Sequence, residues 1–326
     1  MTFPALTNLN HKSKLGKWSN APRSVAKGLN LILGSHPLQP LFRIRFLQVA
    51  ICIGLVWSVP LLSSPSTHAH GTFRERIGRL NRQIKQDPRN AELYLTRAGI
   101  YRNRGEWDAA LADIDRAAQL DPDRRDVDYF RGRVFLAADQ PQKAEAALRR
   151  FLETAPDHPA ARVARARALA KLGRHLEAAE EYTHAIQHAP VPIPEYYLER
   201  AQALAHGGEE HHGEAIRGLD EGMVRLGPLV TLALAAIELE VEGGRFDAAL
   251  ARLERVATRA PHQEAWLARR GDILERAGRK QAARESFQLA LAEIGRLPSH
   301  RRKTKAMVRL EACVREAIER LSTSAP

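Results

Sequence analysis

The sequence predicts an all-α fold: an α-solenoid of stacked helix-turn-helix repeats with a capping helix at each end. One observation is a set of four prolines 34 residues apart, namely Pro88, Pro122, Pro156 and Pro190. The other is a small residue twelve positions before each of the last three, namely Ala110, Ala144 and Ala178. A fixed period of this length is typical of helical pairs that stack, because one pair alone cannot bury its apolar face.

The net charge of the chain, +12, comes from its two ends. A basic region at residues 1–45 holds seven Lys or Arg and no acidic residue, and from residue 301 on seven Lys or Arg stand against three Glu. Residues 71–300 hold 36 basic and 35 acidic residues and are nearly neutral. Nucleic acid is therefore not an expected partner. The basic run at 301–305 could serve it only in a cytoplasmic chain.

Residues 46–70 have the layout of a signal peptide or a membrane anchor. A basic region precedes the uncharged apolar run Phe46–Leu62, and a small, polar stretch with a candidate cleavage site after Ala69 follows. The basic region is long for a signal peptide, so either translation starts after Met1 or the apolar run is an uncleaved anchor. Seventeen residues is also the short limit of a membrane span. A buried helix of a soluble domain fits less well, because residues 1–45 offer little with which to complete a core.

Either interpretation places the repeats outside the cytoplasm, because the basic flank stays inside. We expect a periplasmic or secreted protein, free or held at the inner membrane. The cysteines are Cys52 and Cys313, so a chain cleaved after residue 69 cannot form an internal disulfide. Stability must then come from helix packing.

Residues 73–88 are expected to form the N-terminal cap. Leu80, Ile84 and Pro88 are in register with the second helix of a repeat. A helix at this position covers the apolar face of the first complete unit, as terminal repeats do in stacked arrays.

The segment Ala91–Pro122 is the clearest unit. The small side chains of Ala98 and Ala110 allow its two helices to approach closely. Gly105 permits the turn between them, and Pro122 cannot continue a helix. The residues at helical spacing on the two facing stripes are Tyr94, Ala98 and Tyr101 in the first and Ala110, Ile114 and Ala117 in the second.

This pattern closely resembles the tetratricopeptide repeat. Arg97 departs from the family's usual leucine, and we expect one weaker contact there. Residues 91–297 then hold six such units, at 91–122, 125–158, 159–192, about 194–229, 230–263 and 264–297. The turn of the fourth unit, HGGEEHHGE, is two residues longer than the others. Residues 299–322 carry apolar side chains at helical spacing and are expected to form a C-terminal capping helix.

The resemblance implies that protein or peptide partners bind in a concave groove lined by the first helix of each unit. Charged groove positions are basic toward the N-terminus and acidic toward the C-terminus, a field that orients a polar peptide. The expected partner-contacting residues are Arg102, Arg133, Arg167, Lys171, Glu199, Glu238, Glu242, Asp272 and Glu275. The alternative is a merely solvated face of helices rich in Arg and Glu.

Leu95 and Gly99 stand where family members that hold a terminal carboxylate carry Lys and Asn, so that type of binding is not expected. The His/Glu-rich stretch 206–214 contains residue types that bind zinc. Its glycines favour a flexible, solvated loop, and we predict no metal and no cofactor. Phosphate-binding loops, nucleophile elbows and zinc-protease motifs are absent from the sequence, so an enzyme is not expected.

The sequence thus predicts a non-enzymatic, extracytoplasmic scaffold that binds protein or peptide partners in its concave groove, in an adaptor or assembly role. The alternative is a membrane-anchored regulatory or maturation subunit of a membrane enzyme or secretion complex. The fourth unit is the expected functional junction, because its longer turn lies where the groove changes from basic to acidic.

Overall fold

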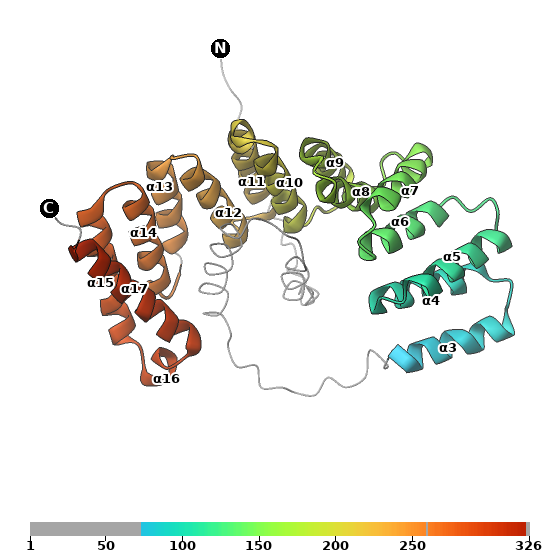
Figure 1. Ribbon diagram of the computed structural model, residues 1–326, viewed down its shortest axis with the longest axis horizontal. Coiled ribbons are helices and arrows are strands. Elements are labelled where there is room, and N and C mark those ends of the chain that lie inside the picture. Colours follow the sequence, from blue (N-terminus) through green and yellow to red (C-terminus); the bar gives the residue numbers. More distant parts are fainter. Residues whose placement is uncertain (1–72, 259, 324–326) are drawn as a thin grey trace, which may run out of the picture. The chain divides into compact units, whose positions relative to one another are not determined.

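The computed structural model describes residues 73–258 and 260–323 of the chain. Every regular element within these residues is a helix (Figure 1), which confirms the predicted all-α solenoid. The regions expected at 1–45 and 46–70 lie outside the described residues. Among the helices between 73 and 323, none is long and apolar enough to cross a membrane.

The cap helix α3 (Phe73–Gln86) precedes six helical pairs, and we call the two members of each pair the first and the second helix. The pairs are α4 (Ala91–Arg104) with α5 (Trp107–Leu120), α6 (Val127–Ala137) with α7 (Pro141–Thr154), α8 (Pro159–Lys171) with α9 (His175–His188), α10 (Pro194–Gly207) with α11 (His212–Leu226), α12 (Val230–Glu242) with α13 (Phe246–Ala257), and α14 (Glu264–Arg276) with α15 (Lys280–Arg296).

The closing region, expected as one helix over 299–322, is divided into α16 (Ser299–Arg302) and α17 (Lys305–Thr323). Thr304 explains the division, because its hydroxyl oxygen accepts a hydrogen bond from the backbone N–H of Met307 at 3.4 Å. An N-cap of this kind satisfies a donor at the start of a new helix. The packing of α17 against α15 covers the last repeat.

The turn inside the first pair depends on a left-handed residue. Gly105 has φ 81°, and its N–H donates to the carbonyl of Arg102 at 3.2 Å. Glycine takes this conformation without steric cost. Gly105 can therefore end α4 while its N–H caps a carbonyl of the last helical turn. In the second pair Asp139 occupies the corresponding place with φ 57°. Aspartate is one of the residue types that tolerate a positive φ.

Small residues bring the two helices of a pair together. Ala98 and Ala110 are 1% and 0% exposed, as the first unit's pattern predicted. In the second pair the same role falls to Gly132, where an added Cβ would lie 2.5 Å from the Cγ of Leu148. The side chain of one helix therefore fills the space that its neighbour leaves open, as close packing requires.

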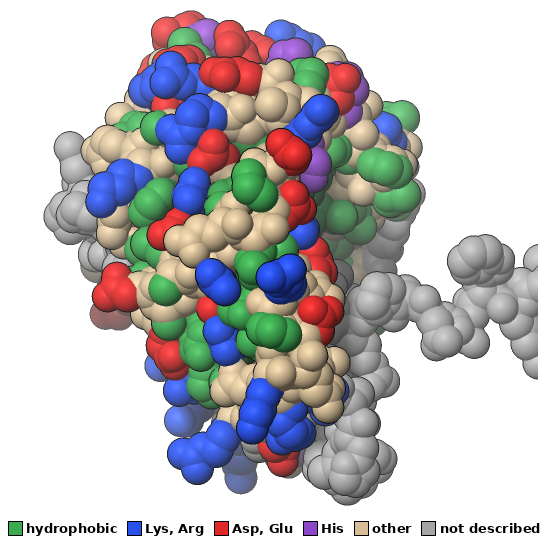
Figure 2. Space-filling view, turned by 90° about the vertical axis from the view of Figure 1, so that its right-hand side faces the viewer, with side chains coloured by type: hydrophobic (Ala, Val, Ile, Leu, Met, Phe, Trp, Pro, Cys, Tyr) green, Lys and Arg blue, Asp and Glu red, His purple; other side chains and the backbone are tan. Residues whose placement is uncertain are grey.

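Helices pack in chain order, each second helix against the first helix of the next pair. First helices of neighbouring pairs also contact one another directly, as α4 does with α6, α6 with α8, and α10 with α12. The first helices therefore form a continuous surface. Charged side chains of both signs are interspersed over most of the face drawn in Figure 2, in agreement with the charge balance of residues 71–300.

Arg97 makes a polar link where the family pattern has leucine. Its guanidinium donates to both carboxylate oxygens of Asp113, at 2.7 and 2.6 Å, and to the side-chain oxygen of Asn81 at 2.7 Å. Asp113 is buried. The weaker contact expected at Arg97 is therefore replaced by an ion pair between α4 and α5 and a hydrogen bond from α4 to Asn81 of α3.

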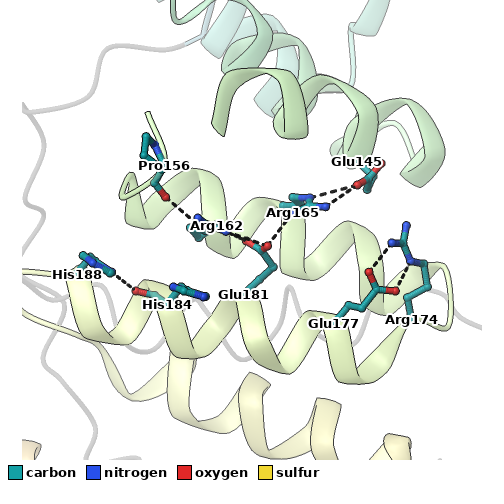
Figure 3. A network of polar contacts seen from close by, with 9 residues as sticks. All are labelled: Glu145, Pro156, Arg162, Arg165, Arg174, Glu177, Glu181, His184 and His188. Carbon is teal, nitrogen blue, oxygen red and sulfur yellow. Dashed lines mark hydrogen bonds and ion pairs between the residues drawn. The ribbon is translucent and has the colours of Figure 1, made fainter. Parts of the chain in front are cut away.

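A second polar network ties the second pair to the third (Figure 3). Arg165 donates to Glu145 of α7 at 3.0 Å and to Glu181 of α9 at 2.7 Å. Arg162 donates to the same Glu181 at 3.0 Å and to the carbonyl of Pro156 at 2.8 Å. The Glu181 side chain is only 9% exposed, so burial costs its carboxylate hydration. The ion pairs with Arg162 and Arg165 compensate for that loss.

Candidate partner-binding groove

The candidate site is the surface of the six first helices, which we call the groove. All nine predicted partner-contacting residues lie on these helices. They are Arg102 on α4, Arg133 on α6, Arg167 and Lys171 on α8, Glu199 on α10, Glu238 and Glu242 on α12, and Asp272 and Glu275 on α14.

Two of these side chains are partly shielded from water. Arg167 and Asp272 are exposed on the first helices. Desolvation by the surrounding protein is nevertheless the largest influence on the pKa of each. Their charges are therefore less hydrated than those of side chains that extend freely into water.

At the middle of the groove, Arg167 and Glu199 form a bidentate ion pair with both contacts at 2.8 Å. The hydroxyl of Tyr182 donates to the same carboxylate at 2.6 Å. Desolvation alone would lower the pKa of Arg167, but its hydrogen bond to Glu199 and the charge of that carboxylate raise it above its ordinary value. Both predicted groove charges are therefore satisfied within the chain.

Three more predicted residues have partners inside the chain. Lys171 pairs with Asp139, and Glu238 pairs with Arg269. Glu275 accepts from Arg320 of the closing helix α17 at 3.0 Å. The basic-to-acidic field along the groove is therefore weaker than the formal charges predict, since five of the nine groups are neutralised by neighbours.

Asp272 and Glu242 remain at the acidic end. Glu242 is exposed near the end of α12. Desolvation raises the pKa of Asp272 to about 6; the positive charge of Arg269 opposes this shift, and the negative charge of Glu275 adds to it. A carboxyl group with this pKa gains and loses its proton close to neutral pH.

Arg102 and Arg133 form the basic end, and no carboxylate of the described residues lies within ion-pair distance of either. Arg102 donates to the neutral side-chain oxygen of Asn103, at 2.9 Å for the shorter contact. The guanidinium of Arg133 lies 5.2 Å from the ring centre of Tyr129. Desolvation lowers the pKa of Arg102, and the positive charge of Arg133 lowers it further.

Sequence analysis did not single out two aromatic residues of the groove, Tyr129 on α6 and Tyr196 on α10. Desolvation raises the pKa of Tyr196, the charge of Arg167 opposes the shift, and Glu199 and Tyr129 add to it. Both rings are half-buried, and the influence of Tyr129 on the pKa of Tyr196 indicates that the two lie near each other. Tyr129 stands four residues before Arg133, a spacing that puts both on one helix face and could have revealed it.

The longer turn of the fourth pair is ordered rather than a flexible loop. Residues Glu209–His211 form the 3₁₀ helix η1, and His212, the first residue of α11, is buried. The ring of His206 stacks on that of His175 of α9 at 5.1 Å. Within residues 73–323, with 259 aside, no three His, Cys, Asp or Glu side chains gather closely enough to hold a metal ion.

Comparison with known proteins gives a family match. A model of the tetratricopeptide repeat family matches residues 71–125, 129–192 and 234–298, more than half of the chain. The stretch between these last two matches holds the fourth pair with its longer turn. No curated protein matches the chain.

Several solved structures are similar to parts of this chain. A tetratricopeptide repeat protein from Parabacteroides merdae has 16% identity, covers 77% of this chain and 98% of its own, and has a TM-score of 0.44. The protein pilF of Pseudomonas aeruginosa has 14% identity, with 68% and 96% covered and a TM-score of 0.45. Yeast Tom70 has 16% identity, with 74% and 47% covered and a TM-score of 0.45. At such low identity the partners of these proteins do not transfer to this chain.

Proposed function

Because the chain belongs to the tetratricopeptide repeat family, as its repeats predicted, we propose that it is a non-enzymatic scaffold that binds protein or peptide partners along the groove. Repeats of this family indicate a scaffold for protein–protein interaction. The finer proposal is an adaptor or assembly role in which the first helices make the contacts.

The observation that carries this proposal is the set of charged side chains on the first helices that have no ion-pair partner among the described residues. Arg102, Arg133 and Glu242 reach solvent there without a carboxylate or cation from the described residues to neutralise them. Charged groups that are incompletely hydrated interact more strongly with an incoming partner than the same groups in bulk water. A partner of complementary charge therefore gains most by binding at this face.

Site-specific photo-crosslinking tests the role of the groove. A photo-reactive residue replaces Gln202, exposed on the first helix α10, or Gln187, exposed on the second helix α9. The two positions match in residue type and exposure and differ in the face they occupy. We expect a crosslinked partner from position 202 in living cells and none from position 187. Equal crosslinking from both positions, or from 187 alone, would contradict binding in the groove.

We also propose that the repeats lie outside the cytoplasm. The basic region 1–45 followed by the apolar run Phe46–Leu62 supports this location. Osmotic shock separates the two expected forms. Release of the repeats at a mass that lacks residues 1–69 would identify a cleaved signal peptide. Retention on membranes at full mass would identify an anchored subunit, which is the form that a regulatory or maturation role at a membrane complex requires. Protection of the repeats from protease in cells with a permeable outer envelope would contradict both.

A further inference from the structure

We propose that the basic end of the groove recognises two acidic side chains of an extended partner peptide through Arg102 and Arg133. The inference rests on the proposed function, because it names the partner chemistry of the same groove. No carboxylate of the described residues lies within ion-pair distance of these two arginines. The other predicted groove cations are paired, Arg167 with Glu199 and Lys171 with Asp139.

The environment of the pair favours an incoming anion. Arg102 and Arg133 come from adjacent first helices, α4 and α6, and each is half-buried. The charge of Arg133 acts on Arg102 strongly enough to lower its pKa, while Asn103 offers only a neutral amide oxygen. Two like charges held together with incomplete hydration gain from a carboxylate that supplies both opposite charge and hydrogen-bond acceptors.

Acidic side chains fit this pair better than a single terminal carboxylate. A single carboxylate can accept from two guanidinium groups, as Glu181 does from Arg162 and Arg165, but it then balances only one of the two positive charges. Two acidic side chains balance both, whereas a peptide terminus supplies one carboxylate. In an extended peptide, side chains two residues apart point to the same side and are about 7 Å apart. Tyr129 packs against Phe151 and His158, with ring centres 5.3 and 5.0 Å apart, and its ring lies 5.2 Å from the guanidinium of Arg133, so it restricts where that charge can lie.

A nucleic acid fits the groove less well, because its charge continues along the chain. Beyond the basic end, the groove presents Glu242 on α12 and Asp272 on α14. A continuous polyanion that follows the groove would meet these carboxyl groups. A short acidic stretch ends before it reaches them.

Fluorescence anisotropy tests the inference with the full chain, kept in solution in a mild non-ionic detergent. Three fluorescein-labelled peptides of equal length serve as probes. The first alternates Glu with neutral residues and has an amidated terminus, the second replaces each Glu by Gln, and the third is the Gln peptide with a free terminal carboxylate. An unlabelled single-stranded oligonucleotide is the competitor.

We expect the Glu peptide to bind at least about tenfold more tightly than either Gln peptide at low salt. Arg102→Gln and Arg133→Gln should each weaken its binding about tenfold. The matched control is Arg149→Gln on the second helix α7, since Arg149 is exposed and belongs to the same pair as Arg133. It should leave the affinity unchanged. Replacing Arg102 by Gln removes a like-charge contact, so the fold is retained, and thermal unfolding of each variant checks this.

Three outcomes would overturn the inference: equal affinity for the Glu and amidated Gln peptides, equal losses in Arg133→Gln and Arg149→Gln, or displacement of the Glu peptide by the oligonucleotide at lower concentration than by unlabelled Glu peptide. Preference for the Gln peptide with a free terminus would also overturn it and would identify a terminal carboxylate as the ligand. In each case a crosslinked partner at position 202 would still support the groove as the binding face, so failure here is distinct from failure of the proposed function.

Discussion

The guanidinium of Arg167 and the carboxylate of Glu199 face each other across the first helices α8 and α10, with two parallel contacts of 2.8 Å. This pair stands where the groove was expected to change from basic to acidic. Because the two charges cancel, the groove has no abrupt reversal of field at its centre. Its uncompensated cations instead lie on the two preceding first helices, Arg102 on α4 and Arg133 on α6.

A double-mutant cycle on Arg167→Gln and Glu199→Gln should show a coupling free energy of about 1 kcal/mol, measured by urea unfolding. Bidentate geometry raises the value above that of an ordinary surface pair, and the 47% exposure of the Arg167 side chain limits it. The pair Arg174–Glu177 is the control and should show a smaller coupling, because its carboxylate is 50% exposed whereas that of Glu199 is 13% exposed. Coupling no larger than in the control would mean that the central pair is merely a surface contact.

Glu181→Ala should destabilise the chain by roughly 3 kcal/mol, because Arg162 and Arg165 would lose the carboxylate that compensates both charges in a mostly buried position. Arg165 would keep Glu145, which places the loss near the lower end for a broken buried pair. Urea unfolding gives the free energy. Glu177→Ala on the same helix is the control, since its side chain is 50% exposed and pairs with Arg174 in a solvated position, and it should lower the unfolding midpoint far less. Similar losses of stability in both variants would show that the contacts of Glu181 with its two arginines stabilise the chain no more than the exposed contact of Glu177 does.

The proline and alanine period predicted the helical pairs because packing repeats with the sequence: small residues such as Ala110 recur wherever two helices meet. The pairing of groove charges was missed for a related reason. Arg167 and Glu199 are 32 residues apart, as are Lys171 and Asp139. This separation is two residues less than the repeat, so it brings side chains of neighbouring pairs together. The spacing of residues along one helix does not show which side chains of a neighbouring helix they contact. The ion pairs between first helices therefore became visible only in the three-dimensional structure.

Chain stability should fall between about pH 4 and pH 6 because of Asp272. Its folded-state pKa is raised to about 6, so over this range the folded chain holds a proton that the unfolded chain has released. The stabilisation from this proton is complete at pH values below the pKa of Asp272 in the unfolded chain. It is lost as the pH rises through the pKa of Asp272 in the folded chain. The charged groups that act on Asp272 are Arg269, Glu275, Arg320 and Arg276; the arginines favour its ionised form and Glu275 opposes it.

Asp272→Asn should therefore increase stability at pH 7.5 and remove this pH dependence. The full shift corresponds to roughly 3 kcal/mol, and solvent screening of an exposed side chain reduces the expected gain to about 1 kcal/mol or less. Asp247→Asn is the control with the opposite sign, because Arg279 lowers the pKa of Asp247 and the substitution removes a favourable pair. Urea unfolding at pH 4.5 and 7.5 measures both. A loss of stability in Asp272→Asn at pH 7.5 would contradict the raised pKa.

Two glycine-to-alanine substitutions on first helices should have opposite effects. At Gly271 a new Cβ would lie 2.6 to 2.8 Å from ring atoms of Phe287, which is 2% exposed in the core between α14 and α15. Overpacking of about 1 to 3 kcal/mol there outweighs the gain in helix propensity. At Gly99 on α4 a new Cβ meets no atom within 4 Å, so alanine should stabilise the helix by about 0.5 to 1 kcal/mol. Urea unfolding of both variants gives the sign. If Gly271→Ala stabilises the chain as Gly99→Ala does, α14 and α15 are not as close as Phe287 indicates, and the glycine there serves no packing role.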